Sequence, residues 1–120
     1  MNKSFEVIPP TIESFMHDVL NSIVKLDLLI YFHSNSRLLG TTADIALHIG
    51  RKHIPLLKVA INDFMQCGIL RPGEDAVGGT LWIYEPNSKM AKRIEEFFQY
   101  YNSSFHARWN VLNACMRTNL

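Results

Sequence analysis

The sequence predicts an α+β fold that is mainly α, with a small β-hairpin. Its 120 residues, of which 48% are hydrophobic and 19% charged, have the size and composition of one globular domain. Apolar residues recur at helical spacing in four stretches, whereas residues 80–84 are rich in β-branched and aromatic residues and follow two glycines. Because no repeat, low-complexity tract or linker divides the chain, we expect a single domain over residues 1–120.

The first helical stretch begins after two prolines, which cannot continue a helix from upstream. Thr11 is a suitable N-cap, and the apolar residues after it share one helix face: Ile12, Phe15, Met16, Val19, Leu20 and Ile23. Residues 23–32 are apolar almost all round, so we expect this segment at the centre of the core. Asn21 and Ser22 form a weak breaker, which leaves open whether one bent helix or two span residues 11–33.

The next stretch predicts a loop at residues 34–36, a stub strand at 37–39 and a short helix at about 43–48. The buried face of this helix would contain Ile45, Ala46 and Ile49. Gly50 follows, as is typical after the end of a helix.

A third helix is expected from about residue 54 to Cys67 and Gly68, with Pro55 tolerated in its first turn. Its buried face is predicted from helical spacing: Ile54, Leu57, Ile61, Phe64 and Met65. A rotation of about 100° per residue points a second set outward: Pro55, Leu56, Val59, Asn62, Asp63 and Gln66.

Residues 69–71 and 80–84 predict a hairpin with a long tip, bounded by Pro86. A last helix then begins at Asn87 or Ser88, and its apolar residues form a stripe: Met90, Ile94, Phe97, Phe98, Tyr101, Phe105, Leu112 and Met116. Residues 102–104 are a candidate break; without one, a helix of about 30 residues would be about 45 Å long.

This order of elements resembles the winged helix-turn-helix domain of small prokaryotic transcriptional regulators. Residues 42–50 and 60–70 are similar to the core of that family, in which a glycine and two aliphatic residues lead from the recognition helix into the wing. Here those residues are Gly68, Ile69 and Leu70. The resemblance covers about residues 22–86, with flanking helices at about 11–21 and 88–117.

The resemblance implies that the third helix enters the major groove of double-stranded DNA and that the hairpin touches its backbone. The residues that it assigns to DNA contact are Arg51, Lys52, His53, Lys58, Asn62 and Arg71. Charge agrees with this assignment: residues 31–72 sum to +3, although the whole chain carries only +1. The alternative is that Arg51 and Lys52 are solvated turn residues.

Two features depart from a typical DNA-reading surface. The outward face of the third helix carries Leu56 and Val59 but no cation, and the hairpin tip carries Glu74 and Asp75, which phosphate would repel. An exposed apolar face suits protein binding, unless the first helix of the chain covers it. The alternative function is therefore a winged-helix interaction or assembly module that does not bind DNA.

Other functions find little support in the sequence. The five histidines and two cysteines show no ligand spacing, so we expect no metal, and no cofactor or catalytic motif suggests an enzyme. The longest apolar run, residues 28–32, is far shorter than the roughly 20 residues of a membrane span, and no signal segment precedes it. We therefore expect a cytoplasmic protein.

A homodimer is expected because the last helix is too aromatic for one core face to cover. Six of the thirteen aromatic residues of the chain lie within residues 97–109. The predicted interface joins the first and last helices: Phe15, Met16, Val19, Tyr100, Phe105, Trp109 and Leu112. A small-molecule effector bound between these helices remains an alternative use of the same aromatics.

Overall fold

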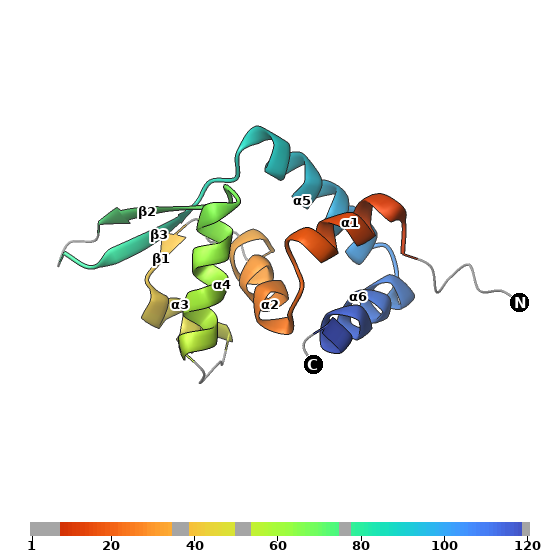
Figure 1. The fold of residues 1–120 in the computed structure, drawn as a ribbon, viewed down its shortest axis with the longest axis horizontal. Coiled ribbons are helices and arrows are strands. Elements are labelled where there is room, and N and C mark those ends of the chain that lie inside the picture. The colour runs from red at the N-terminus through yellow and green to blue at the C-terminus, as the bar shows by residue number, and fades with distance from the viewer. Residues whose placement is uncertain (1–7, 35–38, 50–53, 75–77, 119–120) are drawn as a thin grey trace, which may run out of the picture.

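The computed structural model describes residues 8–34, 39–49, 54–74 and 78–118, which form a group of helices and a small sheet that extends from one side of the molecule (Figure 1). In chain order the elements are α1 (Pro10–Asp18), α2 (Ile23–His33), β1 (Leu39–Gly40), α3 (Thr42–Ile49), α4 (Ile54–Gln66), β2 (Leu70–Glu74), β3 (Thr80–Tyr84), α5 (Ser88–Tyr101) and α6 (Phe105–Thr118). The predicted α+β class is confirmed. The arrangement is compatible with a winged helix, and we call the β2–β3 hairpin the wing.

Two separate helices, α1 and α2, span the first helical stretch. α1 ends at Asp18, and the backbone N–H of Val19 still donates to the carbonyl of Phe15. A new helix then begins because Ser22 is extended and its Oγ accepts a hydrogen bond from the backbone N–H of Lys25 at 3.2 Å. This N-cap explains why two helices, and not one bent helix, form this stretch.

The sheet contains a third strand beyond the hairpin. β1 pairs antiparallel with β3, with Gly40 opposite Trp82, so that the strand order is β1-β3-β2. The wing strands pair antiparallel from Leu70 opposite Tyr84 outward. A Cβ atom at position 40 would come within 2.9 Å of the hydroxyl of Tyr31, so glycine lets β1 lie close to α2.

The core is centred on α2, as its apolar composition predicts. Leu28 and Leu29 are completely buried, and α3, α4 and α6 all pack on this helix. α1 packs on α5, and the two rings at that contact, Phe15 and Phe97, have centroids 5.3 Å apart. One core therefore joins the α2–β3 part of the chain to the flanking helices α1, α5 and α6.

The last helical stretch is divided into α5 and α6. The Oγ of Ser103 donates to the carbonyl of Tyr100 at 2.6 Å, and the Oγ of Ser104 accepts from the backbone N–H of Ala107 at 3.0 Å. These two serines end one helix and begin the next, so the chain turns and α6 packs against α2 and α5. The turn is visible in Figure 1. The candidate break at residues 102–104 is confirmed, and the predicted apolar stripe is divided between two helices, with Phe105 at the start of the second.

The end of α4 and the start of α5 meet at Gly68. The backbone N–H groups of Gly68 and Ile69 donate to the carbonyls of Met65 and Phe64, a Schellman end that requires the positive φ of +87° at the glycine. The carbonyl of Gly68 also accepts from the backbone N–H of Asn87 at 2.9 Å. Any side chain at position 68 would collide with the amide of Asn87. This joint closes the base of the wing.

Candidate nucleic-acid interface

α3 and α4 form a packed pair that leaves one side of α4 toward solvent. Thr41 caps α3 through its Oγ1, which accepts from the backbone N–H of Asp44 at 3.1 Å. Ile45 and Ala46 are buried from α3, as predicted, whereas Ile49 is only half-buried. α4 buries Leu57, Ala60, Ile61 and Phe64. The hydrophobic spacing of the two helices therefore fixes which face of α4 remains accessible.

The accessible face of α4 matches the predicted outward set. Leu56 and Val59 are 54% and 57% exposed, so the alternative that α1 covers them is wrong. Asn62 and Gln66 are also exposed, and Asp63 is half-buried. The face thus combines two apolar side chains with two amides that are capable of hydrogen bonding to adenine.

The structure describes only two of the five residues that were predicted to contact phosphate, Lys58 and Arg71. Arg51, Lys52 and His53 lie outside the described residues. Lys58 is exposed on the flank of α4. Arg71 is exposed at the root of the wing, but its Nε lies 2.6 Å from Oε1 of Glu85.

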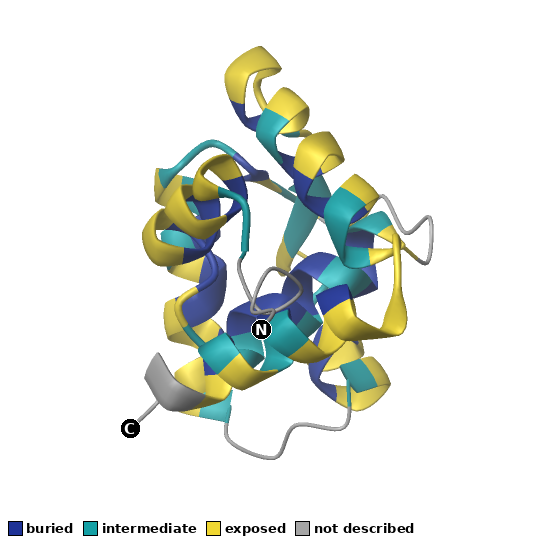
Figure 2. Cartoon of the chain, turned by 90° about the vertical axis from the view of Figure 1, so that its right-hand side faces the viewer, coloured by how far each residue is buried: buried dark blue, intermediate teal, exposed yellow. Residues whose placement is uncertain are grey.

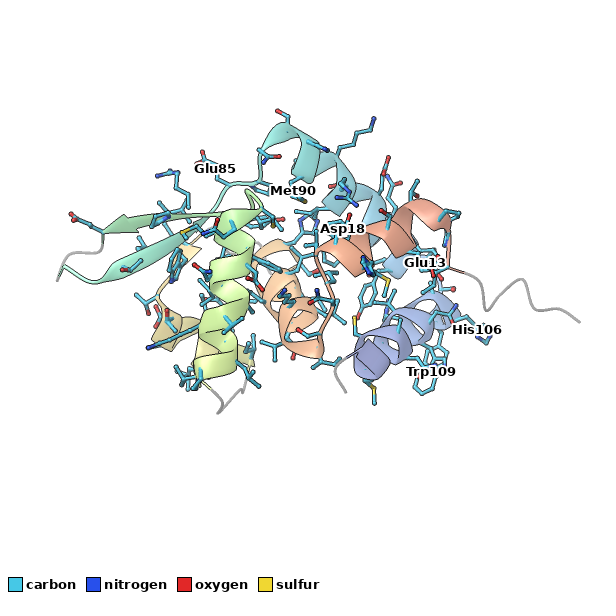
Figure 3. All side chains as sticks on the ribbon, viewed as in Figure 1. Glu13, Asp18, Glu85, Met90, His106 and Trp109 are labelled. Atoms are coloured by element: carbon cyan, nitrogen blue, oxygen red, sulfur yellow. The ribbon has the colours of Figure 1, made fainter. Side chains whose placement is uncertain are left out.

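Glu85 was missed by sequence reasoning, and Figure 3 shows it at the root of the wing. The register of the wing explains the pairing. Arg71 lies opposite Ile83, so Glu85, two residues later and just past the end of β3, is in reach of the guanidinium. Both side chains are more than half exposed, so the pair contributes little to stability. Its effect on this surface is to offset one positive charge.

The root of the wing contacts α3 and α2, and the same residue of α2 also packs on α5. The indole N–H of Trp82 donates to Oγ1 of Thr42 at 3.2 Å, which joins β3 to α3. His33 of α2 stacks on Phe98 of α5 with centroids 4.4 Å apart, and its Nδ1 lies 3.0 Å from the hydroxyl of Tyr84. Burial raises the pKa of Tyr84 to about 12. The wing is therefore fixed relative to α3 and hence to α4.

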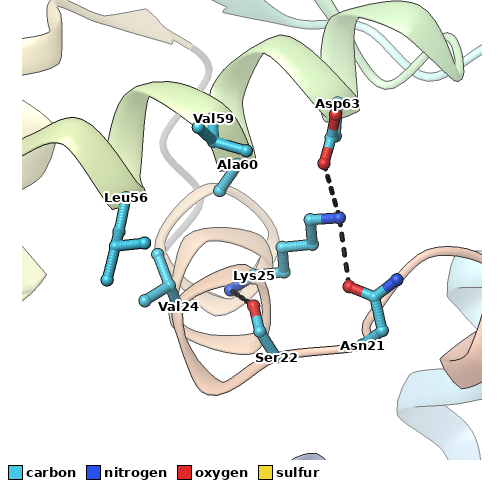
Figure 4. Close-up of a pocket in the computed structure, with 8 residues that line it drawn as sticks. All are labelled: Asn21, Ser22, Val24, Lys25, Leu56, Val59, Ala60 and Asp63. Carbon is cyan, nitrogen blue, oxygen red and sulfur yellow. Dashed lines mark hydrogen bonds and ion pairs between the residues drawn. The ribbon is translucent and has the colours of Figure 1, made fainter. Parts of the chain in front are cut away.

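A second unpredicted contact joins α2 to α4 (Figure 4). The ammonium of Lys25 lies 2.7 Å from Oδ2 of Asp63 and 3.1 Å from Oδ1 of Asn21. These three residues lie along a groove of about 480 Å³, which Leu56 and Val59 also line. Sequence reasoning placed Lys25 only on an apolar helix, and helical spacing alone does not pair residues from two helices.

The predicted dimer residues fall into two groups. Phe15, Met16 and Val19 are buried in the core of the chain itself, where α1 packs on α5. They offer no surface to a partner, so the predicted interface has to be corrected. The apolar helix face that they form packs in the core of the same chain. Figure 2 shows the contrast between buried and exposed positions along the helices.

The second group lies on or beside α6. Phe105 and Trp109 are 77% and 54% exposed, whereas Tyr100 and Leu112 are partly buried. Trp109 projects from α6 away from the body of the molecule (Figure 3). With Met116, which is also exposed, three of these residues form what we call the α6 stripe: Phe105, Trp109, Leu112 and Met116. Their spacing of four, three and four residues is that of a helix–helix seam.

The described residues contain neither an activated cysteine nor a cluster of metal-ligating side chains. Burial raises the pKa of the Cys67 thiol, and it raises that of Cys115 to about 11, so neither is an activated thiol. Within the described residues no group of three or more metal-ligating side chains comes together. In the same part of the chain, no helix has the length and apolar character needed to cross a membrane.

Comparisons of the chain with protein-family models, curated proteins and solved structures gave no match. Its function is therefore inferred from its own residues and geometry.

Proposed function

We propose that the chain is a winged-helix transcriptional regulator that binds double-stranded DNA as a cytoplasmic homodimer. The observation that carries this proposal is the accessible face of α4, which lies between α3 and a wing held at its root by Trp82 and Tyr84. A helix of 13 residues that is exposed along one side has the dimensions to enter a major groove.

Under this proposal, α4 lies in the major groove and the wing lies along the backbone. Asn62 reads base edges, and Lys58 contacts phosphate. Arg51 and Lys52, which with His53 immediately precede α4 in the sequence, supply further positive charge at its N-terminus, and His53 adds an imidazole that can donate to phosphate. Arg71 contributes less than an unpaired arginine because Glu85 is beside it.

The α6 stripe supplies the dimer contact in this proposal. It exposes large apolar side chains that the core of the chain leaves uncovered, and α6 contains no aspartate or glutamate. A second copy of the stripe would cover it without burying an unpaired carboxylate. Two copies of α4 would then read two half-sites, which a monomer cannot do.

The proposal is tested by fluorescence anisotropy with random duplex DNA at low salt. We expect micromolar binding that weakens steeply as salt is added, and Arg51→Ala/Lys52→Ala should weaken binding and reduce the salt slope by about 2. Lys89→Ala/Lys92→Ala on α5 is the matched control, since it removes the same charge from exposed positions on another helix. If the Arg51 and Lys52 variant keeps both its affinity and its salt slope, these phosphate contacts are wrong.

A second candidate function is a winged-helix protein-interaction module. The observation that favours it is the apolar exposure on the two helices that would meet DNA: Leu47 of α3 is 83% exposed, in addition to Leu56 and Val59 of α4. Absence of salt-dependent DNA binding by the wild-type protein would favour this candidate over the first.

A further inference from the structure

Asp63 is an obstacle to DNA binding by α4. It is the only carboxylate among the 13 residues of this helix, and it lies between the exposed Asn62 and Gln66 in sequence. Its side chain is 45% exposed, at the edge of the accessible face. A free carboxylate there would meet the phosphates of a bound duplex and repel them.

Lys25, which lies on the neighbouring helix α2, forms an ion pair with that carboxylate. Its Nζ is 2.7 Å from Asp63, a separation typical of a strong, charge-assisted hydrogen bond, and Asn21 accepts a second hydrogen bond from the same ammonium. Figure 4 shows the ammonium between the two oxygen atoms. The side chain of Lys25 is only 11% exposed, so its charge is not presented to a phosphate.

We infer that Lys25 is a positioning residue for DNA recognition: it neutralises Asp63 and turns its carboxylate away from the DNA-facing side of α4. This inference rests on the proposed function. It differs from the assignment of phosphate contacts, because Lys25 acts on DNA through another side chain of the protein. Without this cation, the carboxylate of Asp63 would carry an uncompensated negative charge that opposes DNA binding.

Three variants test the inference in the anisotropy assay with random duplex DNA: Lys25→Met, Asp63→Asn and the double variant. Lys25→Met keeps most of the side-chain volume and exposes the Asp63 charge, and we expect about tenfold weaker binding. Asp63→Asn should bind at least as tightly as wild type. The double variant should return to within about threefold of wild type, because the repelling charge is gone.

The salt slope separates this role from direct contact. Lys25→Met should leave the slope unchanged, whereas Lys58→Met, the matched exposed lysine of α4, should reduce it by about 1. A reduced slope for Lys25→Met would mean that Lys25 contacts phosphate itself and would overturn the inference.

The remaining outcomes are equally decisive. If Lys25 only anchors α4, the double variant stays as weak as Lys25→Met. If Asp63 contributes directly to DNA contact, Asp63→Asn binds more weakly than wild type.

Circular dichroism monitors the folding of each variant. If Lys25→Met alone does not fold, Asp63→Asn and the double variant still decide, since anchoring predicts that both lose affinity. A wild-type protein without salt-dependent binding removes the proposed function itself, whereas normal wild-type binding with an unaffected Lys25→Met removes only this inference.

Discussion

α5 and α6 have the same length of 14 residues but distribute their apolar side chains differently. α5 turns its large apolar residues inward, where Met90, Ile94, Phe97 and Phe98 are buried. α6 buries small or medium side chains, namely Ala107, Val111 and Cys115, and leaves Phe105 and Trp109 exposed.

The difference shows that hydrophobic content and contribution to the core are separate properties of a helix. Other parts of the same chain cover the apolar side of α5, and lysines and glutamates occupy its other side. Small inner residues let α6 approach α2 closely, and the Sγ of Cys115 lies 3.5 Å from the carbonyl of Leu20. The large residues on its outer side have no role in the core that would explain them, which supports the proposed dimer contact.

The inner face of α5 should produce the largest change in stability. Phe97→Ala removes a completely buried ring that contacts Phe15, and we expect the free energy of unfolding to fall by about 3–5 kcal/mol. Urea unfolding followed by circular dichroism measures it. Gln99→Ala, an exposed position two residues away, is the control and should change stability by less than about 0.5 kcal/mol. Equal effects of the two substitutions would contradict the inward assignment of α5.

The outer face of α6 should affect assembly more than folding. Phe105→Ser/Trp109→Ser is expected to convert the dimer to a monomer while the helical circular dichroism signal is kept, because both side chains are exposed within one chain. Light scattering coupled to gel filtration measures the mass, with His106→Ser as the control on the same helix. A wild-type species near 13.8 kDa at micromolar concentrations would rule out the dimer and the two-half-site proposal.

The smallest effect concerns the thiol on the inner face of α6. Alkylation at pH 8 should modify Cys67, which is half-buried, faster than Cys115, which is buried and has its pKa raised from 9.0 to about 11. The folded state thus favours the neutral thiol, and Cys115 destabilises the fold as pH rises above 9 toward 11. Mass spectrometry of the alkylated cysteines measures the two rates. Faster modification of Cys115 would place α6 away from α2.

Periodicity was the most informative signal in the sequence. The centre of the buried face of α4, Leu57, Ile61 and Phe64, was predictable because one helix packed on one core obeys a single repeat. Its edges were not, since Ile54 and Met65 are only half-buried and Ala60 is buried. Gly68 was recognisable because a Schellman end needs a positive φ. The same signal misled at Phe15, Met16 and Val19. An apolar stripe predicts that a helix face is buried, but it does not indicate whether the same chain or a partner buries it.

Contacts between distant segments could not be obtained in this way. The pairing of β1 with β3 and the ion pair of Lys25 with Asp63 each join residues more than 35 positions apart. They depend on where whole elements pack, which no local pattern encodes. The site is accordingly less predictable than the fold, since a single cross-helix contact decides whether a carboxylate on α4 is neutralised.

The joint between Gly68 and Asn87 makes the wing an exchangeable module. Because both ends of the hairpin are tied together at the body, its length can change without moving the start of α5, and each doubling of a flexible loop costs only about 0.6 kcal/mol. Gly78 is exposed, with open space where a side chain would begin. Because the φ of Gly78 is +87°, a side chain at that position would be strained, so it suits an inserted segment rather than a substitution. Wings of different length would fit onto the same body.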